Sequence, residues 1–567
     1  MILGETLFYN ISMSFLSKRT LLLLVLIAAA GMAVYSNAFQ VPFIFDDGTY
    51  IVDNPIIRSF RNFVFPSEIK DLHRGAYFLP GAKQAFKTRP LAFLTFALNY
   101  RLNGLDVWGY HLVNLLIHIV NSILVFGFVM ITFKTLSLRG KGGLERPVAT
   151  LTYPQAIAFF TALFFAVHPV QTQAVTYITQ RFASLAALFF LASLASYAAF
   201  RLSEGKKTKV LLYAASLSGA ILAMLTKEMS FTLPIVMAVY EFIFLKGNSR
   251  KRAVLLAPFF LAMLIIPLNL SRGGLHASMT VLGDSQGMSR WGYLFTELRV
   301  LVTYIRLLFF PVNQNLDYDY PAYGSIFEPP VFLSFLFLSG LFLLAVFLLY
   351  RAGRRGEERI ELRLISFGIF WFFITISVES GLVPLRDFIY EHRLYLPSVG
   401  FLLAFTAFLL SQIGRLKRFR LPALVAPLVL ALALGGAAYA RNNVWGSKIS
   451  LWEDAVRKSP NKFRPHYTLA FSYYEAGLYM LAVREGRISV ALEPNDPLNR
   501  FNLALFYEKT GMLDEAVNEF RAAIELNPWD SIAHYNLGRV YRRLGRSDEA
   551  RREFEESIAL SRHSQGY

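Results

Sequence analysis

The 567-residue sequence contains no cysteine. Thiolate chemistry and cysteine-ligated zinc sites are therefore excluded, and any exported part of the chain must be held together by packing alone. The sequence also lacks the composition of a soluble protein, because 55% of its residues are apolar, 15% are aromatic and the mean hydropathy is +0.42. These values are typical of a chain embedded in a lipid bilayer.

A phosphate-binding glycine loop is missing as well. Gly273-Gly274 and the other glycine pairs lack the strand and the helix that such a loop requires. Asp317-Tyr318-Asp319 looks like an Asp-x-Asp metal motif, but a lone motif of this kind is weak evidence. No metal site is expected, although the sequence leaves a divalent metal open.

What the sequence has instead is a series of apolar runs of transmembrane length. The first run, 21–39, follows Lys18 and Arg19, and its length and poor cleavage site favour a retained membrane helix over a signal peptide. Residues 291–310 are also apolar, but Arg290 precedes them and Glu297, Arg299 and Arg306 interrupt them, which favours an interfacial or partly buried helix. The further predicted spans are 111–133, 155–170, 181–200, 210–226, 231–245, 254–270, 327–350, 364–383, 397–413 and 421–440.

Positively charged loops decide the number of spans. Lys18 and Arg19 place the N-terminus in the cytoplasm, and if 291–310 does not span, all basic loops fall on the same side. We therefore predict eleven spans with an external C-terminus, and we attribute the net charge of +18 to topology and anionic lipid rather than nucleic acid. The loop residues are Lys134, Arg139, Lys141, Arg146, Arg201, Lys206, Lys207, Lys209, Lys246, Arg250, Lys251, Arg252, Arg351, Arg354, Arg355, Arg359, Arg363, Arg415, Lys417, Arg418 and Arg420.

An internal repeat begins after Ala440, where the long apolar runs end. Equivalent leucine, tyrosine, glycine, alanine and proline residues recur every 34 positions: Leu469, Leu503 and Leu537; Tyr473, Tyr507 and Tyr541; Gly477, Gly511 and Gly545; Ala482, Ala516 and Ala550; Pro460, Pro494 and Pro528. This pattern is the tetratricopeptide signature, in which small residues let two antiparallel helices approach and proline ends the second helix. We predict a membrane domain over 1–440 and a repeat domain over 441–567, with a half repeat at 449–460 and three full repeats at 463–562. Such arrays offer a concave surface to a peptide or partner, although a packing or oligomerisation module stays open.

Polar residues gather at the predicted outer ends of the spans. Ionisable groups at membrane depth are functional candidates because their burial is expensive. Together they suit a reaction on an amphiphilic substrate with an anionic head. They are Asp46, Asp47, His168, Gln173, Gln180, Arg181, Lys227, Glu228, Glu379, Glu391, His392 and Arg393.

Several of these residues also allow a structural interpretation. Lys227-Glu228 can be a simple turn pair, and His168 before Pro169 can cap a helix. His111, Asn114 and His118 lie on one face of a helix, where hydrogen bonds to neighbouring helices are favoured over catalysis.

Five stretches together resemble a known family: FDDGTYIVDNP, TRPLAFLTFALNYRLNGLDVWGYHLVNLLIH, HPVQTQAVTYITQR, TKEMSFTLP and EHRLYLPSVGF, followed by the repeats. In this order they look like the TMTC-type O-mannosyltransferases and their bacterial relatives, membrane glycosyltransferases of the GT-C superfamily. The resemblance covers nearly the whole chain, except for loop 271–326. It implies an all-α fold in which a polytopic helix bundle precedes a tetratricopeptide solenoid.

The resemblance also implies roles for particular residues. Asp46 and Asp47 would include the catalytic base, with Asp46 favoured by its place in the motif, and mutual repulsion would raise one pKa. Arg181, Lys227 and Arg393 would clamp the donor phosphate. Gln173 stands where the family motif has an acid, so it cannot act in acid–base chemistry. Supporting or substrate-binding roles fall to His168, Gln180, Glu228, Glu391 and His392.

The activity implied is inverting transfer of a sugar, such as mannose, from a polyprenyl-phosphate carrier to an acceptor outside the bacterial cytoplasmic membrane. The repeats favour a protein acceptor with Ser or Thr hydroxyls. Membrane lipids are expected partners, whereas nucleic acid and tightly held cofactors are not. Two alternatives remain: a transporter of lipid-linked substrate, disfavoured because the charges cluster at one face, and a membrane-anchored repeat scaffold without transferase activity.

Overall fold

A computed structural model describes residues 17–65, 85–137, 147–148, 151–272, 288–353, 359–381, 385, 387–415 and 422–565. The chain forms two compact units. The membrane unit comprises the chain up to Gln314 together with Pro321–Asn443, and the repeat unit comprises Asn315–Tyr320 and Val444–Tyr567. Some residues named above lie outside the described residues: Arg139, Lys141, Arg146, Gly273, Gly274, Arg354, Arg355, Lys417, Arg418 and Arg420.

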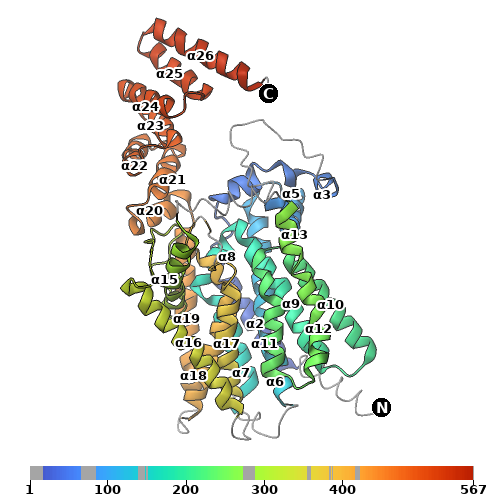
Figure 1. The fold of residues 1–567 in the computed structure, drawn as a ribbon. Coiled ribbons are helices and arrows are strands. Elements are labelled where there is room, and N and C mark those ends of the chain that lie inside the picture. Colours follow the sequence, from blue (N-terminus) through green and yellow to red (C-terminus); the bar gives the residue numbers. More distant parts are fainter. Residues whose placement is uncertain are drawn as a thin grey trace. The chain divides into compact units, whose positions relative to one another are not determined.

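The membrane unit consists mainly of long helices that lie side by side (Figure 1). Their bounds are α2 Lys18–Val34, α5 Pro90–Asn103, α6 Val107–Ser137, α7 Tyr153–Val167, α9 Arg181–Leu202, α10 Lys206–Met224, α11 Leu233–Phe244, α12 Ser249–Ala262, α13 Ile265–Arg272, α15 Arg290–Phe309, α16 Pro329–Gly353, α17 Ile360–Ile376, α18 Pro397–Arg415 and α19 Pro422–Val444.

Short turns of helix connect them at one end of the unit. These are η1 Gly48–Val52, η2 Pro55–Arg58, α3 Arg61–Val64, η4 Pro169–Gln171, α8 Thr172–Thr176, η5 Ile178–Gln180, η6 Glu228–Thr232 and η7 Glu391–Leu394. Two-residue strands β1 Pro147–Val148 and β2 Leu151–Thr152 pair antiparallel, with Pro147 opposite Thr152 and Val148 opposite Leu151.

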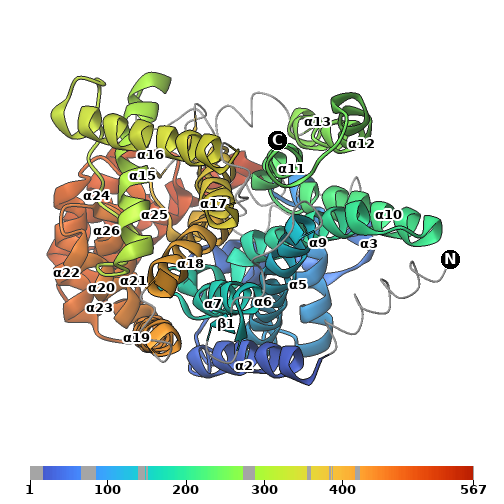
Figure 2. The same ribbon diagram turned by 90° about the horizontal axis from the view of Figure 1, so that it is seen from below.

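The central helix of the bundle is α6, which packs against α2, α7 and α9 (Figure 2). From α7 the packing continues through α18, α17 and α16 to α15, and from α9 it continues to α10. Glycines allow the close contact of α17 with α18: a Cβ added at Gly368 would lie 2.3 Å from the Gly400 carbonyl oxygen. No larger residue fits there without moving a backbone, so this pair fixes the spacing of the two helices.

Every predicted span contains a helix, although 254–270 is divided between α12 and α13 and 364–383 extends beyond the end of α17 at Ile376. Not every helix satisfies the length and apolarity of a full crossing. Among the described residues, five segments do so, and the bent pair Tyr153–Val167 and Pro169–Thr176 adds a sixth. Others are shorter, such as α11 with 12 residues and α17 with 17. The membrane helices are thus confirmed, whereas the total of eleven spans stays a prediction.

The repeat unit contains three antiparallel helix pairs after a single helix, as the 34-residue period predicts. The helices are α20 Lys448–Lys458, α21 Phe463–Glu475, α22 Tyr479–Leu492, α23 Pro497–Thr510, α24 Leu513–Leu526, α25 Ser531–Arg543 and α26 Ser547–Gln565. Gly477, Gly511 and Gly545 follow the first helix of each pair with φ values of 76°, 82° and 76°. Glycine adopts this left-handed conformation without a steric penalty, which explains why it recurs at the period of the fold.

Candidate functional site

The acidic pair lies on a strained turn after α2. Phe45 has a φ of 52°, which is uncommon for a bulky residue and carries a conformational cost. Asp47 is buried at 1% exposure, and its Oδ2 accepts the Ile44 N–H at 3.0 Å. Its Oδ1 accepts the Thr179 N–H at 2.8 Å and the Thr179 hydroxyl. Asp47 therefore ties this loop to the segment that precedes α9.

Burial is the main influence on Asp47. It raises the pKa of that carboxyl to about 7, although hydrogen bonds from Thr179 and Ile44 lower it, and the Asp46 charge contributes least. The prediction of a raised pKa in the pair agrees with this, but repulsion between the neighbours was the wrong main cause. Loss of water around a carboxylate disfavours its charged form more than a neighbouring, partly solvated charge does.

Asp46 differs from its neighbour in exposure. It is half-buried, its backbone N–H donates to the Tyr177 hydroxyl at 2.9 Å, and its side chain also bonds that hydroxyl. Burial, and then the charges of Asp46 and Asp47, raise the pKa of Tyr177 well above its usual value, so the phenol stays protonated. Of the two carboxylates, Asp46 is the one that a substrate hydroxyl can approach.

Two cation–carboxylate pairs lie at the start of η6. Glu228 binds Arg89 through both of its oxygens, at 3.1 Å from Nε and 2.9 Å from Nη2. Burial would raise the pKa of Glu228, but the Arg89 charge and hydrogen bonds lower it overall, so it is ionised. Lys227 Nζ lies 2.5 Å from Glu379 Oε1. The interpretation of Lys227-Glu228 as a simple turn pair is therefore wrong, since each partner binds a distant segment.

The imidazole of His392 faces these cations. Burial, followed by the charges of Lys227, Arg393 and Arg89, holds the pKa of His392 well below its usual range, so the ring is neutral. Gln173 Oε1 accepts both the His392 backbone N–H at 2.7 Å and the ring Nδ1–H at 3.0 Å. The amide that stands where the family motif has an acid thus orients this histidine.

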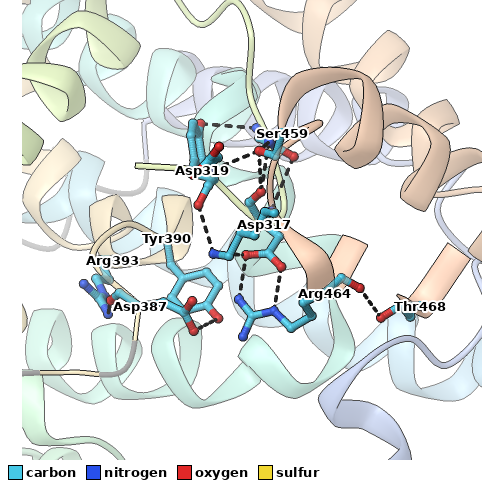
Figure 3. Close-up of polar contacts among 11 residues, drawn as sticks. Asp317, Asp319, Asp387, Tyr390, Arg393, Ser459, Arg464 and Thr468 are labelled. Carbon is cyan, nitrogen blue, oxygen red and sulfur yellow. Dashed lines mark hydrogen bonds and ion pairs between the residues drawn. The ribbon is translucent and has the colours of Figure 1, made fainter. Parts of the chain in front are cut away.

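Arg393 organises the segment before η7. It donates to the carbonyl oxygens of Phe388 at 2.8 Å, Asp387 at 2.9 Å and Glu379 at 3.3 Å, and Glu297 lies 4.0 Å away. Asp387 accepts the Tyr390 hydroxyl at 2.8 Å in the same turn (Figure 3). Because its guanidinium donates to these carbonyl oxygens, Arg393 fixes the backbone at Glu379, Asp387 and Phe388.

Arg181 lies away from these charges, in the protein interior. It is fully buried at 0% exposure and donates to side-chain oxygens of Asn114 at 2.7 Å and Asn99 at 2.6 Å, and to the Tyr110 carbonyl at 3.0 Å. It also stacks on Phe96, with its guanidinium carbon 4.6 Å from the ring centre. Its donors are thus engaged by protein groups rather than presented to a ligand.

The remaining predicted residues have supporting positions. His168 caps η4, because its Nδ1 accepts the Val170 N–H at 3.1 Å and its Nε2 donates to the Leu308 carbonyl at 3.0 Å. Gln180 is buried at the end of η5, and Glu391 is buried at the start of η7.

The polar face of α6 forms interhelical hydrogen bonds, as predicted. His111 bonds the Val41 carbonyl at 2.8 Å, Asn114 bonds Val175 and Ile178, and His118 bonds the Tyr395 hydroxyl at 2.8 Å. This face therefore holds together the segments that carry the site.

Sequence reasoning missed three residues here. Arg89 lies within one of the family stretches, but its partner Glu228 is 139 positions away and only the fold reveals it. Glu297 was read as an interruption of an apolar run, yet it faces Arg393. Gln314, in the loop that matched no motif, donates to Glu391 at 2.7 Å.

The acidic loop and the Arg89–Glu228 pair both act electrostatically on one residue, Tyr50. The pKa of Tyr50 is raised first by burial and then by the charge of Asp46, and Arg89 and Glu228 also act on it. Tyr50 and Arg89 both contact the Phe182 ring, whose centre lies 5.8 Å from the Tyr50 ring centre and 5.2 Å from the Arg89 guanidinium carbon. Among the described residues, no group of three or more His, Asp or Glu side chains could hold a metal ion.

Comparison with known proteins identifies one matching repeat family and several relatives by sequence. The tetratricopeptide repeat family matches residues 496–563. The protein O-mannosyl-transferase TMTC4 of Homo sapiens is 26% identical over 81% of this chain, and the chain spans 64% of its length. The protein O-mannosyl-transferase F38B6.6 of Caenorhabditis elegans is 25% identical over 84% of the chain and is covered over 63% of its own length.

A third relative is similar over a shorter region. The protein O-mannosyl-transferase Tmtc3 of Drosophila melanogaster is 32% identical over 40% of this chain, which covers 24% of that protein. The resemblance to TMTC-type O-mannosyltransferases is therefore confirmed over most of the chain, and the apolar helices identify an integral membrane protein.

Proposed function

We propose that the protein is an inverting membrane glycosyltransferase that moves a sugar, such as mannose, from a polyprenyl-phosphate carrier to a protein hydroxyl. The names of its relatives support mannosyl transfer to protein. The observation that carries the proposal is the half-buried Asp46 carboxylate, held on a strained turn a few residues before Tyr50, which contacts the same Phe182 ring as the Arg89 guanidinium. A base beside cations is what an acceptor hydroxyl and a phosphate leaving group require.

In the proposed reaction Asp46 accepts the proton of the acceptor hydroxyl. The hydroxyl oxygen attacks the anomeric carbon and forms the new C–O bond, while the bond from that carbon to the phosphate oxygen breaks. The electron pair leaves with the lipid phosphate, which needs positive charge more than a proton. Asp47 acts by fixing the turn through Thr179 and Ile44.

Lys227 and Arg89 are the cations that we assign to the phosphate. Each is paired with a carboxylate, Glu379 or Glu228, which keeps the charge compensated. Arg89 and Glu228 are about one quarter exposed, and these are the most accessible charges of the two pairs. We leave Arg181 and Arg393 out of the clamp, because Asn and carbonyl oxygens occupy their donors.

Supporting roles fall to the buried groups around these cations. Neutral His392 is oriented by Gln173 and lies within electrostatic reach of Lys227 and Arg89. Glu391 begins the same turn. Gln180 and His168 hold the neighbouring short helices.

The proposed orientation places Asp46 and the repeat unit outside the cytoplasmic membrane, where the repeats would meet the acceptor. A topology reporter fused after Tyr567 should be active only on the outer side. Activity of that reporter in the cytoplasm would reject the prediction that the site residues and the repeat unit lie on the same, outer side of the membrane. It would also reject an extracytoplasmic acceptor.

The decisive experiment incubates the purified full chain with a set of polyprenyl-phosphate sugars and a Ser/Thr peptide. One donor should be consumed by the unchanged protein and spared by the D46N variant. Equal consumption by both proteins would overturn the role of Asp46. No consumption of any sugar would favour a non-catalytic scaffold.

A further inference from the structure

The chain passes from one unit to the other between two consecutive buried residues. Gln314 belongs to the membrane unit, whereas Asn315 belongs to the repeat unit, although most of that unit begins 129 positions later at Val444. Both side chains are nearly inaccessible, at 3% and 2% exposure. Residues 315–320, here called the strap, are therefore part of the repeat unit's structure.

The strap is anchored by an ion cluster centred on Asp317. Arg464 binds the two Asp317 oxygens at 2.6 Å and 2.5 Å, and Lys462 Nζ lies 2.6 Å from Oδ1. Asp317 itself is 3% exposed, and Figure 3 shows the Arg464 guanidinium directed at its carboxylate. A bidentate arginine pair with little solvent has a defined geometry and resists screening by salt. This Asp-x-Asp sequence therefore serves as an attachment point, with its first carboxylate neutralised by two cations.

A serine hydroxyl completes the anchor. Ser459 Oγ donates to the Asp317 carbonyl at 2.8 Å and accepts from the Asn315 side chain at 2.8 Å and the Asp319 N–H at 2.9 Å (Figure 3). Lys462 also donates to the Tyr318 carbonyl at 3.0 Å. Backbone and side chains of the strap are thus bound at several successive positions.

On the other side of the same peptide bond, Gln314 holds the candidate site. Its Nε2 donates to Glu391 Oε2 at 2.7 Å and to the Pro169 carbonyl at 3.0 Å. Glu391 begins η7, which carries His392 and Arg393. The preceding residue, Asn313, has a φ of 56°, so the backbone enters this position in a left-handed conformation that little else in the described chain adopts.

We infer that Gln314 is a positioning residue for Glu391, and that its own placement depends on the attachment of the strap to the repeat unit. An event on the repeat unit that shifts the strap pulls on Gln314 through one peptide bond. Glu391 and the turn that carries His392 then move with it. The effect on sugar transfer rests on the proposed function, whereas the mechanical link does not.

Such a link gives the repeats a second role besides holding an acceptor. A polypeptide that favours one position of the strap also favours one position of η7. Coupling of this kind is reciprocal and is commonly worth about 5–150-fold in affinity. The inferred partner is therefore the acceptor polypeptide itself, whose binding would set the geometry of the site.

The test measures hydrogen exchange at residues 388–396 in the full-length protein, together with transfer kinetics. Q314A removes the bond to Glu391, and D317N removes the charge that Arg464 and Lys462 bind. Both should raise exchange in this segment and lower kcat about tenfold, because displacement of groups that position the reactants slows the reaction. S459A is a second strap variant if D317N accumulates poorly. R500Q is the matched control, because it breaks an Arg500–Glu519 pair of the same unit away from the strap.

Each outcome decides the inference. Unchanged exchange at 388–396 in Q314A overturns the positioning role, and unchanged exchange in both D317N and S459A overturns the link. An equal increase in R500Q also overturns it, since general loosening of the repeat unit would then explain the effect. The double variant Q314E/E391Q exchanges amide and carboxylate, so it should recover part of the protection that Q314A loses.

The exchange measurement separates this inference from the proposed reaction. If D46N retains full transfer, the proposed function falls while the exchange result still stands. If D46N abolishes transfer and the strap variants change neither exchange nor kcat, the inference falls alone.

Discussion

One set of polar pairs in the repeat unit recurs with the period of the sequence, whereas the pairs of the candidate site in the membrane unit occur once each among the described residues. The repeated pairs are His466–Glu485, Arg500–Glu519 and His534–Glu553, and in each the partner follows 19 positions later. The same three basic side chains bond the carbonyls of Pro460, Pro494 and Pro528. One local geometry therefore stabilises three helix pairs, and the loss of one pair leaves two intact.

The membrane unit instead joins segments that are far apart in the chain. Arg89 and Glu228 are 139 positions apart, and Gln173 and His392 are 219 apart. Each contact closes a long loop and has no copy in the part of the chain that the structure describes. The difference teaches that periodic charges mainly support a fold, whereas a unique set of charges brought together by tertiary structure points to a site.

The largest expected effect comes from D46N. Asparagine has nearly the same volume but cannot accept the acceptor proton, so transfer should fall at least ~100-fold, the usual contribution of a positioned base. The assay is transfer from the donor identified above. E519Q removes the carboxylate that pairs with Arg500 in the repeat unit, and it should leave transfer unchanged. Equal losses of transfer in D46N and E519Q would show that charges of the membrane unit and of the repeat unit do not differ in their role.

A second prediction concerns Arg181. R181A should lower the free energy of unfolding by about 3 kcal/mol, because several buried acceptors lose their donor together. Thermal unfolding in detergent measures this, and R500A should cost less than about 1 kcal/mol as a partly exposed pair. R181K keeps the charge without the planar fork and should fall between wild type and R181A. Selective loss of donor use at unchanged stability would return Arg181 to the phosphate clamp.

Arg89 is expected to have an intermediate effect on the donor. R89Q removes charge-assisted hydrogen bonds to phosphate and should weaken donor binding by about 1.5–3 kcal/mol. The KM for the polyprenyl-phosphate sugar reports this change. E228Q keeps the cation and removes only its partner, so its donor KM should not rise. A larger KM in E228Q than in R89Q would contradict the assignment.

The smallest effect is a pH dependence of the first repeat. Burial lowers the pKa of His466, but the Glu485 carboxylate raises it overall above its usual value. Its stabilising contribution is therefore complete below about pH 6.5 and is lost as the pH rises through the higher folded pKa. Hydrogen exchange of α21 and α22, corrected for intrinsic rates, should show a loss below about 1 kcal/mol.

The neighbouring repeat provides the internal control for that measurement. Arg500 occupies the position of His466 one repeat later, so this repeat has no histidine in the pair, and α23 and α24 should show no such loss. H466R should abolish the dependence in the first repeat. Equal pH dependence in both helix pairs would assign it to a group other than His466.

The helices and the repeats could be predicted from the sequence because their signals are local. Apolar runs located each long membrane helix to within a few residues, and α15 at Arg290–Phe309 matches the run interrupted by charge. The helix α5, at Pro90–Asn103, was not predicted, because its polar residues hide a moderately apolar helix. The glycine period located every helix pair of the repeat unit.

The candidate site could be predicted only in part. The acidic pair was visible as a motif, but which carboxylate is accessible depends on Thr179, which lies 132 positions away from Asp47. Arg181 looked like the other cations until its asparagine partners were known. Gln314 carried no signal, because an amide in an unmatched loop acquires meaning only from its buried partner Glu391.

The strap has a consequence for how such a chain can be recombined in evolution. A fragment that begins at Val444 contains all the repeat helices, yet it leaves Arg464 and Lys462 without the Asp317 carboxylate. A membrane unit cut at Asn443 in turn keeps Asp317 without its counter-ions. Either cut therefore loses the two-cation anchor of Asp317 and the hydrogen bonds between Ser459 and the strap. Exchange of repeats between related chains preserves this anchor only if residues 315–320 are transferred together with the C-terminal helices.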